Sequence, residues 1–403
     1  MAKEVGDVET SINTEETHPP PTTEAEHENE NAIFDAPEGG TRAWLAAGGA
    51  AAIFFSTLGF SNSFGTFEEY YITHQLRGES ASKVSWIGSL GSFLPFFSGM
   101  VAGPMFDRYG EKIIRPATIV YVFAMMILSL SVSQYFHKKR AAALGLAVAG
   151  SSIGGVIIPI VLSKLLNGTS LSFGWSVRIV GFIILPFMVF ACVTVRARLP
   201  PRDSQFWITS TYRNIKFLML ILGFLFMFVG MTAPLFYLPT YAVSQGMGKT
   251  LSGYLIAIIN AASTFGRILI GVLADKYGRI NMFAIGGVAS GVAIFCMNSA
   301  KSNDSLIVYS VAFGFASGTI ISGGSAAFSV CPQDPRDIGT YMGMGMAISG
   351  LGALIGPPIN GAIEGKYGGF FEVSMFSGAM CLLGGLVVIA AKLATKQGLL
   401  GRT

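Results

Sequence analysis

The sequence predicts an all-α integral membrane protein that crosses the bilayer many times. Hydrophobic residues fill 51% of the 403 positions, charged residues only 12%, and the mean hydropathy is +0.56. A soluble domain of average composition would be about one quarter charged. The apolar residues also gather in runs of about 20, the length of helix that crosses ~30 Å of hydrocarbon at ~1.5 Å per residue. We therefore expect a bundle of transmembrane helices.

Eleven apolar runs can be counted, and the small residues within them favour close helix packing. Glycines are frequent within them, as at Gly145, Gly150 and Gly154, and small residues at three- and four-residue spacing let helix backbones approach one another. The expected spans are 43–65, 84–106, 114–134, 140–162, 176–196, 216–240, 251–273, 280–299, 305–330, 339–361 and 370–392.

The charged residues are unevenly distributed. Residues 1–40 carry eleven acids and one base, whereas the remainder of the chain is strongly basic. Basic loops between apolar spans are typical of the cytosolic face of a membrane protein. Nucleic-acid binding is disfavoured, because the bases are scattered between apolar runs and do not cluster with aromatic residues. The acidic segment cannot bury enough apolar surface to fold, so we expect a disordered cytosolic tail.

The number of spans between basic loops is inconsistent with a cytosolic position of all these loops at one place in the sequence. Bases mark the cytosolic side near 108–115, 137–140, 196–216 and 276–279, and an even number of spans should separate these loops. Only one span, 114–134, separates the first two. The simplest account is that one helix is missing near 131–134. The alternatives are that 114–134 enters the membrane without crossing it, or that the acidic tail faces outward.

Two glycosylation sequons agree with this orientation. Asn167 and Asn303 fall in loops that would lie outside if the basic loops after residue 137 lie inside. Both asparagines are candidate glycosylation sites.

A charged turn occurs twice, 168 residues apart, and closes an apolar span each time. Its copies predict two similar parts, an amino-terminal half at 41–200 and a six-helix half at 216–403, joined by a cytosolic loop at 201–215. An acid at such a turn can cap the next helix or bridge to bases, so the turns would be conformational latches. A solvated loop would explain a single copy. The motif residues are Gly103, Asp107, Arg108 and Gly110, then Gly271, Asp275, Lys276, Gly278 and Arg279.

Arg267 is the most informative single residue. It lies about two turns inside an apolar span, where an arginine is costly and tends to face the bundle interior or a water-filled path. Its guanidinium would offer a fork of donors to an anionic group of a substrate. The alternative is that the side chain reaches toward the cytosolic interface.

Other polar residues within spans are candidates for the same cavity. Asn260 and Ser263 precede Arg267, and Tyr237 lies between two prolines that interrupt regular helix. Asn62 and Asn360 lie in the first and tenth spans. For each of these residues alone, a packing or interface role is an alternative.

No catalytic or metal-binding arrangement is apparent. The G-x-S-x-G match at 150–154 lies inside an apolar helical run, without the preceding strand that a nucleophile elbow needs. The four histidines and four cysteines show no ligand spacing. We therefore expect neither an enzyme nor a cofactor or metal.

Several motifs resemble a known family. GPMFDRYG at 103–110, GRILIGVLADKYGR at 266–279, SQYFHKKRAAALGLAVAGSSIGGVIIPI at 133–160, and Glu38-Gly39-Gly40 followed by Trp44 are similar to the major facilitator superfamily. Within it they resemble the monocarboxylate-transporter-like family, especially its fungal members, over roughly 37–395.

The resemblance implies twelve helices in two six-helix halves, alternating access, and substrate binding between the halves. In that family a fourth helix precedes the SQYF segment, and here Ser131 runs directly into it, so the comparison indicates the same missing helix. Animal members carry an acid one turn before the arginine that matches Arg267, whereas this chain has Ser263. Proton coupling is therefore in doubt.

We predict a secondary transporter for a small, anionic, monocarboxylate-like organic solute, with a coupled proton as an open question. It would reside in the plasma membrane or an internal membrane such as the vacuole, and nothing indicates its oligomeric state. The alternatives are an exporter of a fungal secondary metabolite, or a truncated paralogue that does not transport and acts as a membrane interaction protein.

Overall fold

The computed structural model describes residues 39–64, 67, 81–109, 136, 138–195 and 208–393, and the features below belong to these residues. Their regular structure is entirely helical, which confirms the predicted fold class. The helices are α2 (Thr41–Ser61), α4 (Ala81–Tyr109), α7 (Arg140–Gly168), α8 (Phe173–Thr194), α9 (Ile215–Ser244), α10 (Lys249–Tyr277), α11 (Arg279–Phe295), α12 (Asn303–Phe328), α13 (Ile338–Ser349), α14 (Leu351–Tyr367) and α15 (Phe371–Leu393), with 3-10 turns η3 (Thr209–Arg213), η4 (Cys296–Ser299) and η5 (Pro335–Asp337).

Ten of the eleven expected spans coincide with these helices. Within the described part, nine helical segments are long and apolar enough to cross a membrane, and α13 and α14 count as one of them. The eleventh expected span, 114–134, lies outside the described residues, as do the junction at 131–134 and the acidic tail up to residue 38. The predicted missing helix therefore stays a prediction.

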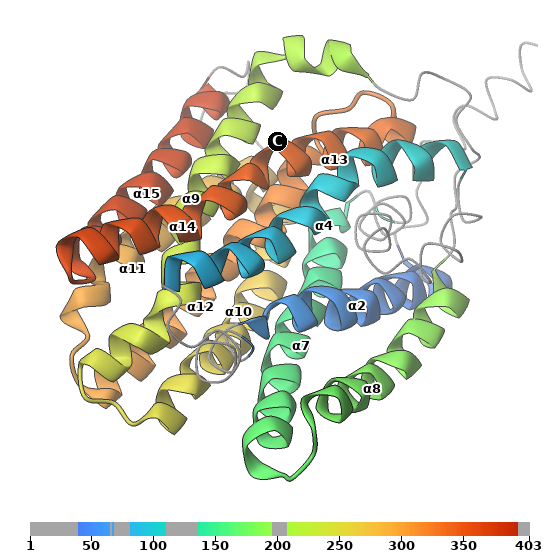
Figure 1. Cartoon of the computed structure of the whole chain (residues 1–403). Coiled ribbons are helices and arrows are strands. Elements are labelled where there is room, and N and C mark those ends of the chain that lie inside the picture. Colours follow the sequence, from blue (N-terminus) through green and yellow to red (C-terminus); the bar gives the residue numbers. More distant parts are fainter. Residues whose placement is uncertain are drawn as a thin grey trace, which may run out of the picture. The chain divides into compact units, whose positions relative to one another are not determined.

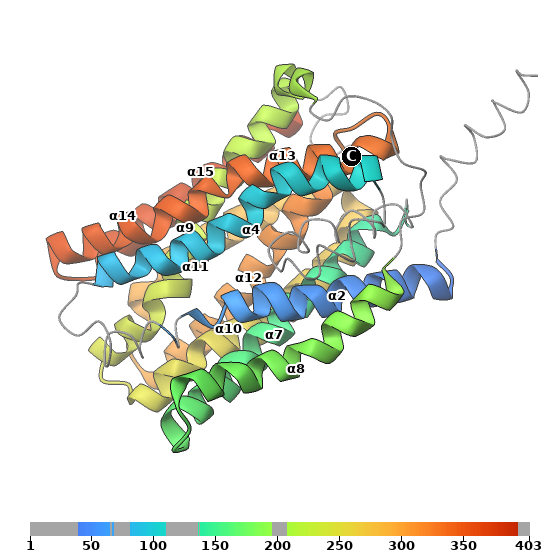
Figure 2. The same ribbon diagram turned by 45° about the vertical axis from the view of Figure 1, so that its right-hand side comes forward.

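The helix break between α13 and α14 lies where another helix approaches. Gly350 separates the two segments, and a Cβ at this position would come within 2.7 Å of the Phe96 side chain on α4. α4 packs along both segments, and Figures 1 and 2 show it beside α13 and α14 from two directions. The glycine therefore gives α4 room at the point where the helix bends.

A second close contact joins α7 to α10. A Cβ at Gly145 would lie 2.5 Å from the Arg267 carbonyl oxygen, and one at Gly271 would lie 2.7 Å from the Ala141 carbonyl oxygen. These glycines let the two backbones approach to a distance that side chains would prevent. α7 also packs against α2, and α10 against α12, so the α7–α10 contact joins helices of the amino-terminal and carboxy-terminal segments. Figure 1 shows α2 beside α7.

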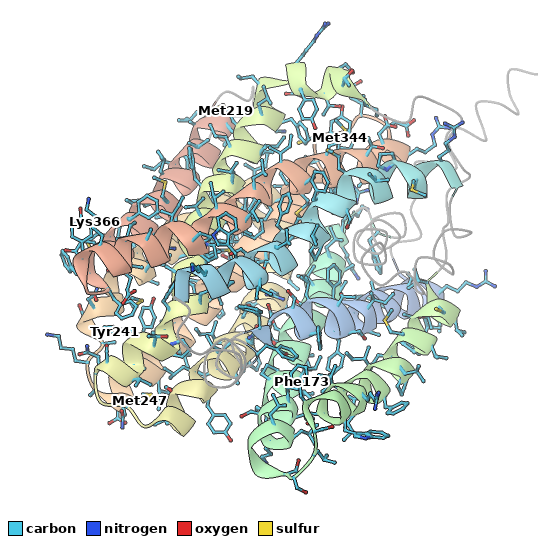
Figure 3. The ribbon with its side chains drawn as sticks, in the orientation of Figure 1. Phe173, Met219, Tyr241, Met247, Met344 and Lys366 are labelled. Atoms are coloured by element: carbon cyan, nitrogen blue, oxygen red, sulfur yellow. The ribbon has the colours of Figure 1, made fainter. Side chains whose placement is uncertain are left out.

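Apolar side chains fill the space between the helices and also cover outward faces. Met247 and Met344 are buried, whereas Lys366 is exposed near the end of α14 (Figure 3). On α8 the outward residues are apolar as well, and Phe182 is 67% exposed. A hydrocarbon-facing helix has this pattern, because lipid tails accept apolar side chains without cost.

Candidate functional site

A cavity of about 880 Å³, including its open mouth, lies among seven helices, α2, α4, α7, α9, α10, α12 and α14. Its polar lining residues are Ser61, Asn62, Ser92, Ser151, Thr232, Asn260 and Arg267. Its apolar lining residues are Leu58, Phe64, Phe96, Phe228, Met231, Leu235, Phe236, Ile256, Ile321 and Ala353.

Arg267 is the charged group of this lining. The side chain is only 3% exposed, and its Nη1 donates to the Val148 carbonyl oxygen at 2.8 Å and to the Ser151 hydroxyl. Its Nε finds no acceptor among the described residues, and no described carboxylate pairs with the guanidinium. A buried cation held only by neutral acceptors retains donors and attraction for an anion.

Two asparagines form the neighbouring part of the polar lining. Asn62 Nδ2 donates to Asn260 Oδ1 at 3.3 Å, which links α2 to α10. Asn260 Nδ2 in turn donates to the carbonyl oxygens of Gly155 at 3.3 Å and Ile256 at 3.0 Å. A Cβ at Gly155 would lie 2.8 Å from Asn260 Cγ, so the glycine provides the space for both amides. The polar end of the cavity is thus built where α2, α7 and α10 meet.

Aromatic side chains line the remainder of the cavity. Phe96 of α4 lies 5.0 Å from Phe228 of α9, and Phe64 lies 6.2 Å from Phe236, measured between ring centroids. Phe228 also stacks on Phe224 at 4.4 Å, which fixes its orientation. The cavity lining is therefore amphipathic, because it combines a cation and amides with four phenylalanine rings.

The structure brings three of the six predicted binding residues to this cavity: Asn62, Asn260 and Arg267. Ser263 is buried beside them, but its hydroxyl faces the Ser152 hydroxyl at 3.4 Å and the backbone of Gly318.

The other two predicted residues, Tyr237 and Asn360, lie in helix packing. The Tyr237 hydroxyl donates to the Pro357 carbonyl oxygen at 2.8 Å, which ties α9 to α14. Asn360 is fully buried and its Oδ1 accepts a hydrogen bond from the Ser377 hydroxyl at 2.8 Å. Neither residue is part of the cavity lining.

Sequence reasoning missed Ser151 and the aromatic lining residues Phe64, Phe96 and Phe228. Ser151 belongs to the G-x-S-x-G string that was set aside as a false catalytic motif. Phe96 and Phe228 occur in runs rich in phenylalanine, where the sequence alone does not distinguish an inward ring from a lipid-facing one.

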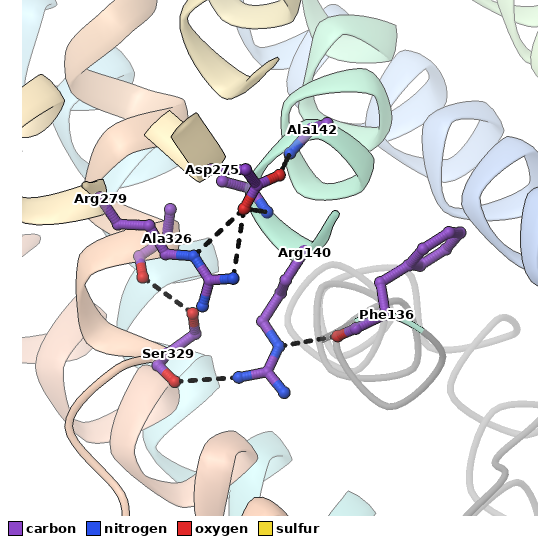
Figure 4. Close-up of polar contacts among 8 residues, drawn as sticks. Phe136, Arg140, Ala142, Asp275, Arg279, Ala326 and Ser329 are labelled. Atoms are coloured by element: carbon purple, nitrogen blue, oxygen red, sulfur yellow. Dashed lines mark hydrogen bonds and ion pairs between the residues drawn. The ribbon is translucent and has the colours of Figure 1, made fainter. Parts of the chain in front are cut away.

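The second charged turn connects two helix ends. Asp275 Oδ1 accepts from the Ala141 amide at 3.0 Å and Oδ2 from the Ala142 amide at 2.9 Å (Figure 4). Arg279 donates to the same carboxylate, with Nη2 at 3.2 Å from Oδ1. These two amides belong to the first turn of α7, whose donors have no partners within the helix. Asp275 of α10 therefore caps α7.

Arg140 makes a second link at this end and was predicted only as a marker of the cytosolic side. Its Nε donates to the Phe136 carbonyl oxygen at 2.9 Å, and its Nη1 to the Ser329 carbonyl oxygen at 3.2 Å (Figure 4). Ser329 follows the last residue of α12, where a cation is favourable. Arg140 thus joins α7 to α12.

The structure also describes the remaining motif residues of the second turn, Lys276 and Gly278. Gly278 follows α10 with a φ of 102°, a conformation that favours glycine, and α11 begins at the next residue. The Lys276 ammonium lies 5.2 Å from the centroid of the Tyr277 ring.

In the first copy, Gly103, Asp107 and Arg108 lie in the last turns of α4, and Arg108 is exposed. The Asp107 side chain and the residue Gly110 are outside the described part of the chain. The latch role of this copy stays a prediction.

The candidate modification sites lie at helix ends. Asn167 is in the last turn of α7, and Asn303 is the exposed first residue of α12. Their glycosylation stays a prediction. No group of three or more His, Cys, Asp or Glu residues that could hold a metal occurs in the part of the chain that the structure describes.

Membrane-spanning helices around a central cavity that holds a buried charge are the arrangement of a multi-pass membrane transporter. The family model of the Major Facilitator Superfamily matches residues 122–323 and 255–399. The chain belongs to this superfamily, and it is a transporter and not an enzyme.

Similar curated proteins come from fungi. The chain is 44% identical over 409 residues to the aspyridones efflux protein apdF of Emericella nidulans, covering 94% of this chain and 82% of that protein. It is 37% identical over 395 residues to the agnestins efflux protein AgnL12 of Paecilomyces divaricatus, covering 89% of each.

Solved structures share the fold at low sequence identity. The human organic anion transporter MFSD10 (TETRAN) superposes with a TM-score of 0.66 at 12% identity, covering 87% of this chain and 100% of that one. The proton:xylose symporter XylE gives 0.65 at 13% identity, covering 93% and 98%. These likenesses bear on the fold alone.

Proposed function

We propose that this transporter exports a small, amphipathic organic anion of the secondary-metabolite kind by alternating access. The observation that carries the proposal is the buried Arg267 guanidinium, which lines the cavity without a described carboxylate partner. The aromatic lining around Phe96 and Phe228 provides a surface for the apolar body of such a solute. The names of the fungal relatives support efflux as the direction.

Uptake of a simple monocarboxylate is the alternative within the same class. The four phenylalanine side chains in the cavity lining favour a more apolar solute than a short carboxylate. Export of a metabolite into the medium would require the plasma membrane, which we retain as the proposed location.

Alternating access would use two halves, which we propose at 41–200 and 216–403 with the loop 201–215 between them. In support, the cavity is lined by helices from both segments, and Asp275 and Arg140 link their helix ends. Release of these bonds would accompany opening of this end of the cavity, so Asp275 would act as a latch.

We also propose that one helix is missing after residue 131. In the carboxy-terminal part, α12 packs closely along α10, whereas the described helices that pack along α4 are α13 and α14, and none of the described amino-terminal helices does so. The alignment with apdF is longer than the part of this chain that it covers, so some positions of the relative have no counterpart here. Sequencing of the transcript and genomic DNA across the codons for Ser131 and Val132 tests this. An intervening run of apolar codons supports the missing helix, and a contiguous junction contradicts a splicing or gene-model origin.

The export proposal is tested in proteoliposomes that contain the full chain. Initial uptake is measured for three labelled anions of increasing apolar size: acetate, phenylacetate and naphthalene-2-sulfonate. We expect saturable transport that favours the larger anions, and we expect Arg267→Gln to abolish it. The matched control is Arg178→Gln, because Arg178 is exposed on α8 over the ring of Trp175 and outside the cavity. Unchanged kinetics in Arg267→Gln would contradict the proposal.

A further inference from the structure

The helices that line the cavity carry their acidic residues only at their ends. α2, α7 and α9 contain no acid within their bounds. The acids of the other four lining helices lie in a first or last turn, and they are Asp107, Asp275, Asp304 and Glu364. None of these acids belongs to the cavity lining. The four histidines of the sequence all lie outside the described residues.

The carboxylate nearest to Arg267 along its own helix is already engaged. Asp275 follows two turns later, about 12 Å along the axis at ~1.5 Å per residue. Its two oxygens accept hydrogen bonds from the Ala141 and Ala142 amides and from Arg279. On α7, the charged residues are Arg140 near the start and Lys164 near the end, and both are cations. Among the described residues, the lining therefore has one formal charge and no group that could neutralise it.

This imbalance affects the two directions of the transport cycle differently. When the cavity closes around an anion, the guanidinium is desolvated together with a counter-charge. Arg267 is already only 3% exposed, so when the cavity closes empty its buried charge loses the remaining contact with water at the mouth and gains no counter-charge, which is unfavourable. If the closed state binds the anion more tightly than the open state does, the anion raises the population of the closed state by that difference in binding free energy. The loaded carrier should therefore pass through the closed state more readily than the empty one.

From this we infer that the transporter is an anion exchanger, in which an anion must occupy the cavity on the return step as well. The inference rests on the proposed function, because it needs Arg267 to bind the transported anion. One anion leaves as another enters, Arg267 keeps its charge throughout, and no proton is transferred. For two monovalent anions the exchange moves no net charge.

The exchange is tested with the full chain in proteoliposomes and external labelled naphthalene-2-sulfonate. One set of vesicles holds the unlabelled probe, and the other holds only zwitterionic buffer and sucrose. We expect initial uptake to be about tenfold faster into the loaded vesicles, which corresponds to a barrier for the return step that is lower by about 1.4 kcal/mol. We also expect no stimulation by a pH gradient or by a valinomycin-imposed potential.

The outcomes separate the inference from the proposed function. Equal uptake into both vesicle types, or uptake driven by a pH gradient, would overturn exchange while leaving an anion carrier. Absence of uptake in both would remove the proposed function and the exchange with it.

Asn260→Asp gives the cavity a counter-charge with almost no change in volume. Asn260 lies two turns before Arg267 and lines the same cavity. We expect this variant to take up the probe into sucrose-filled vesicles, and to do so faster when the outside is acidic, because protonation of the new carboxylate removes the negative charge that would repel the entering anion from the cavity. The neutral variant Asn260→Ala removes a cavity side chain and should lower the uptake rate in both vesicle types, but the ratio of loaded to sucrose-filled uptake should stay that of the wild type.

Both variants are first compared with the wild type by gel filtration and by thermal unfolding. A folded Asn260→Asp protein that remains as dependent on internal anion as the wild type would overturn the role of the missing counter-charge. A folded Asn260→Ala protein that loses this dependence would do the same.

Discussion

Two of the contacts between the amino-terminal and carboxy-terminal helices differ in chemistry. The α7–α10 contact is polar, with hydrogen bonds from Arg267 to Val148 and from the α7 amides to Asp275. The described part of the α4 contact with α9, α13 and α14 is apolar, with Phe96 against Phe228 and Gly350. Directed hydrogen bonds favour one discrete arrangement, whereas apolar surfaces tolerate small sliding movements. We therefore expect conformational control on the α7–α10 side and adaptation to the solute on the α4 side.

The largest effect should come from filling the closest backbone approach. Gly145→Val would place a side chain where a Cβ alone would lie 2.5 Å from the Arg267 carbonyl oxygen. Overpacking of this kind costs about 1–3 kcal/mol, and more where backbone cannot move, so thermal unfolding should shift down by several degrees or folding should fail. The control is Gly253→Ala on α10, where no atom lies within 4 Å of the new Cβ. It should leave the unfolding temperature unchanged or raise it, and a similar loss in both variants would contradict the close contact.

Asp275→Asn should act on turnover. The amide retains a single acceptor oxygen and places an NH₂ group beside the α7 amides and Arg279, so the cap is weakened by about 1–2 kcal/mol. In a latch role these bonds stabilise the closed state of this end, so the variant should re-form that state less readily in each cycle. This predicts a roughly tenfold loss in kcat, the equivalent of ~1.4 kcal/mol, with a smaller change in KM. The measurement is the concentration dependence of initial uptake rates. A change confined to KM would contradict the latch.

Arg140→Gln should give a smaller effect in the same direction. It removes the charge-assisted hydrogen bond to the Ser329 carbonyl oxygen at the end of α12, a loss of about 1 kcal/mol. Lys164→Gln, an exposed change on the same helix, is the control. Thermal unfolding and kcat are compared for the two variants. Equal behaviour would show that Arg140 contributes nothing beyond its charge.

The smallest expected change is in the reactivity of Cys331, two residues after Ser329. Burial raises the pKa of this thiol to about 11, opposed by nearby Lys216, so little thiolate is present at neutral pH. Maleimide labelling should be slow at pH 7 and accelerate as the pH rises toward that pKa. Asp275→Asn should modestly increase the rate at pH 7 if the polar contact opens more often. Fast labelling of Cys331 itself at neutral pH, distinguished by peptide mapping from labelling of the exposed Cys296, would contradict the burial.

Helix positions and the central charge could be predicted from the sequence, because both depend on local composition. An apolar run of about 20 residues specifies a spanning helix, and Arg267 is conspicuous within one. The partners of each polar side chain could not be predicted. Ser263 lies one turn from Arg267 yet faces Ser152 and Gly318. The Tyr237 hydroxyl donates a hydrogen bond to the Pro357 carbonyl oxygen and does not line the cavity. These hydrogen-bond partners depend on which helices pack together, and the spacing of residues along one helix does not specify its neighbours.

The position of the α7 cap has a consequence for biosynthesis. Lys139, which precedes α7, provides no side-chain hydrogen bond to the helix, and its first-turn amides at Ala141 and Ala142 depend on Asp275, more than 130 residues further along the chain. A ribosome completes α7 well before α10 is made, so this helix end waits in the membrane interface with unpaired donors. Final assembly of the amino-terminal helices is thus coupled to the arrival of the carboxy-terminal ones, and a chain arrested between them should be recognised as immature by quality control.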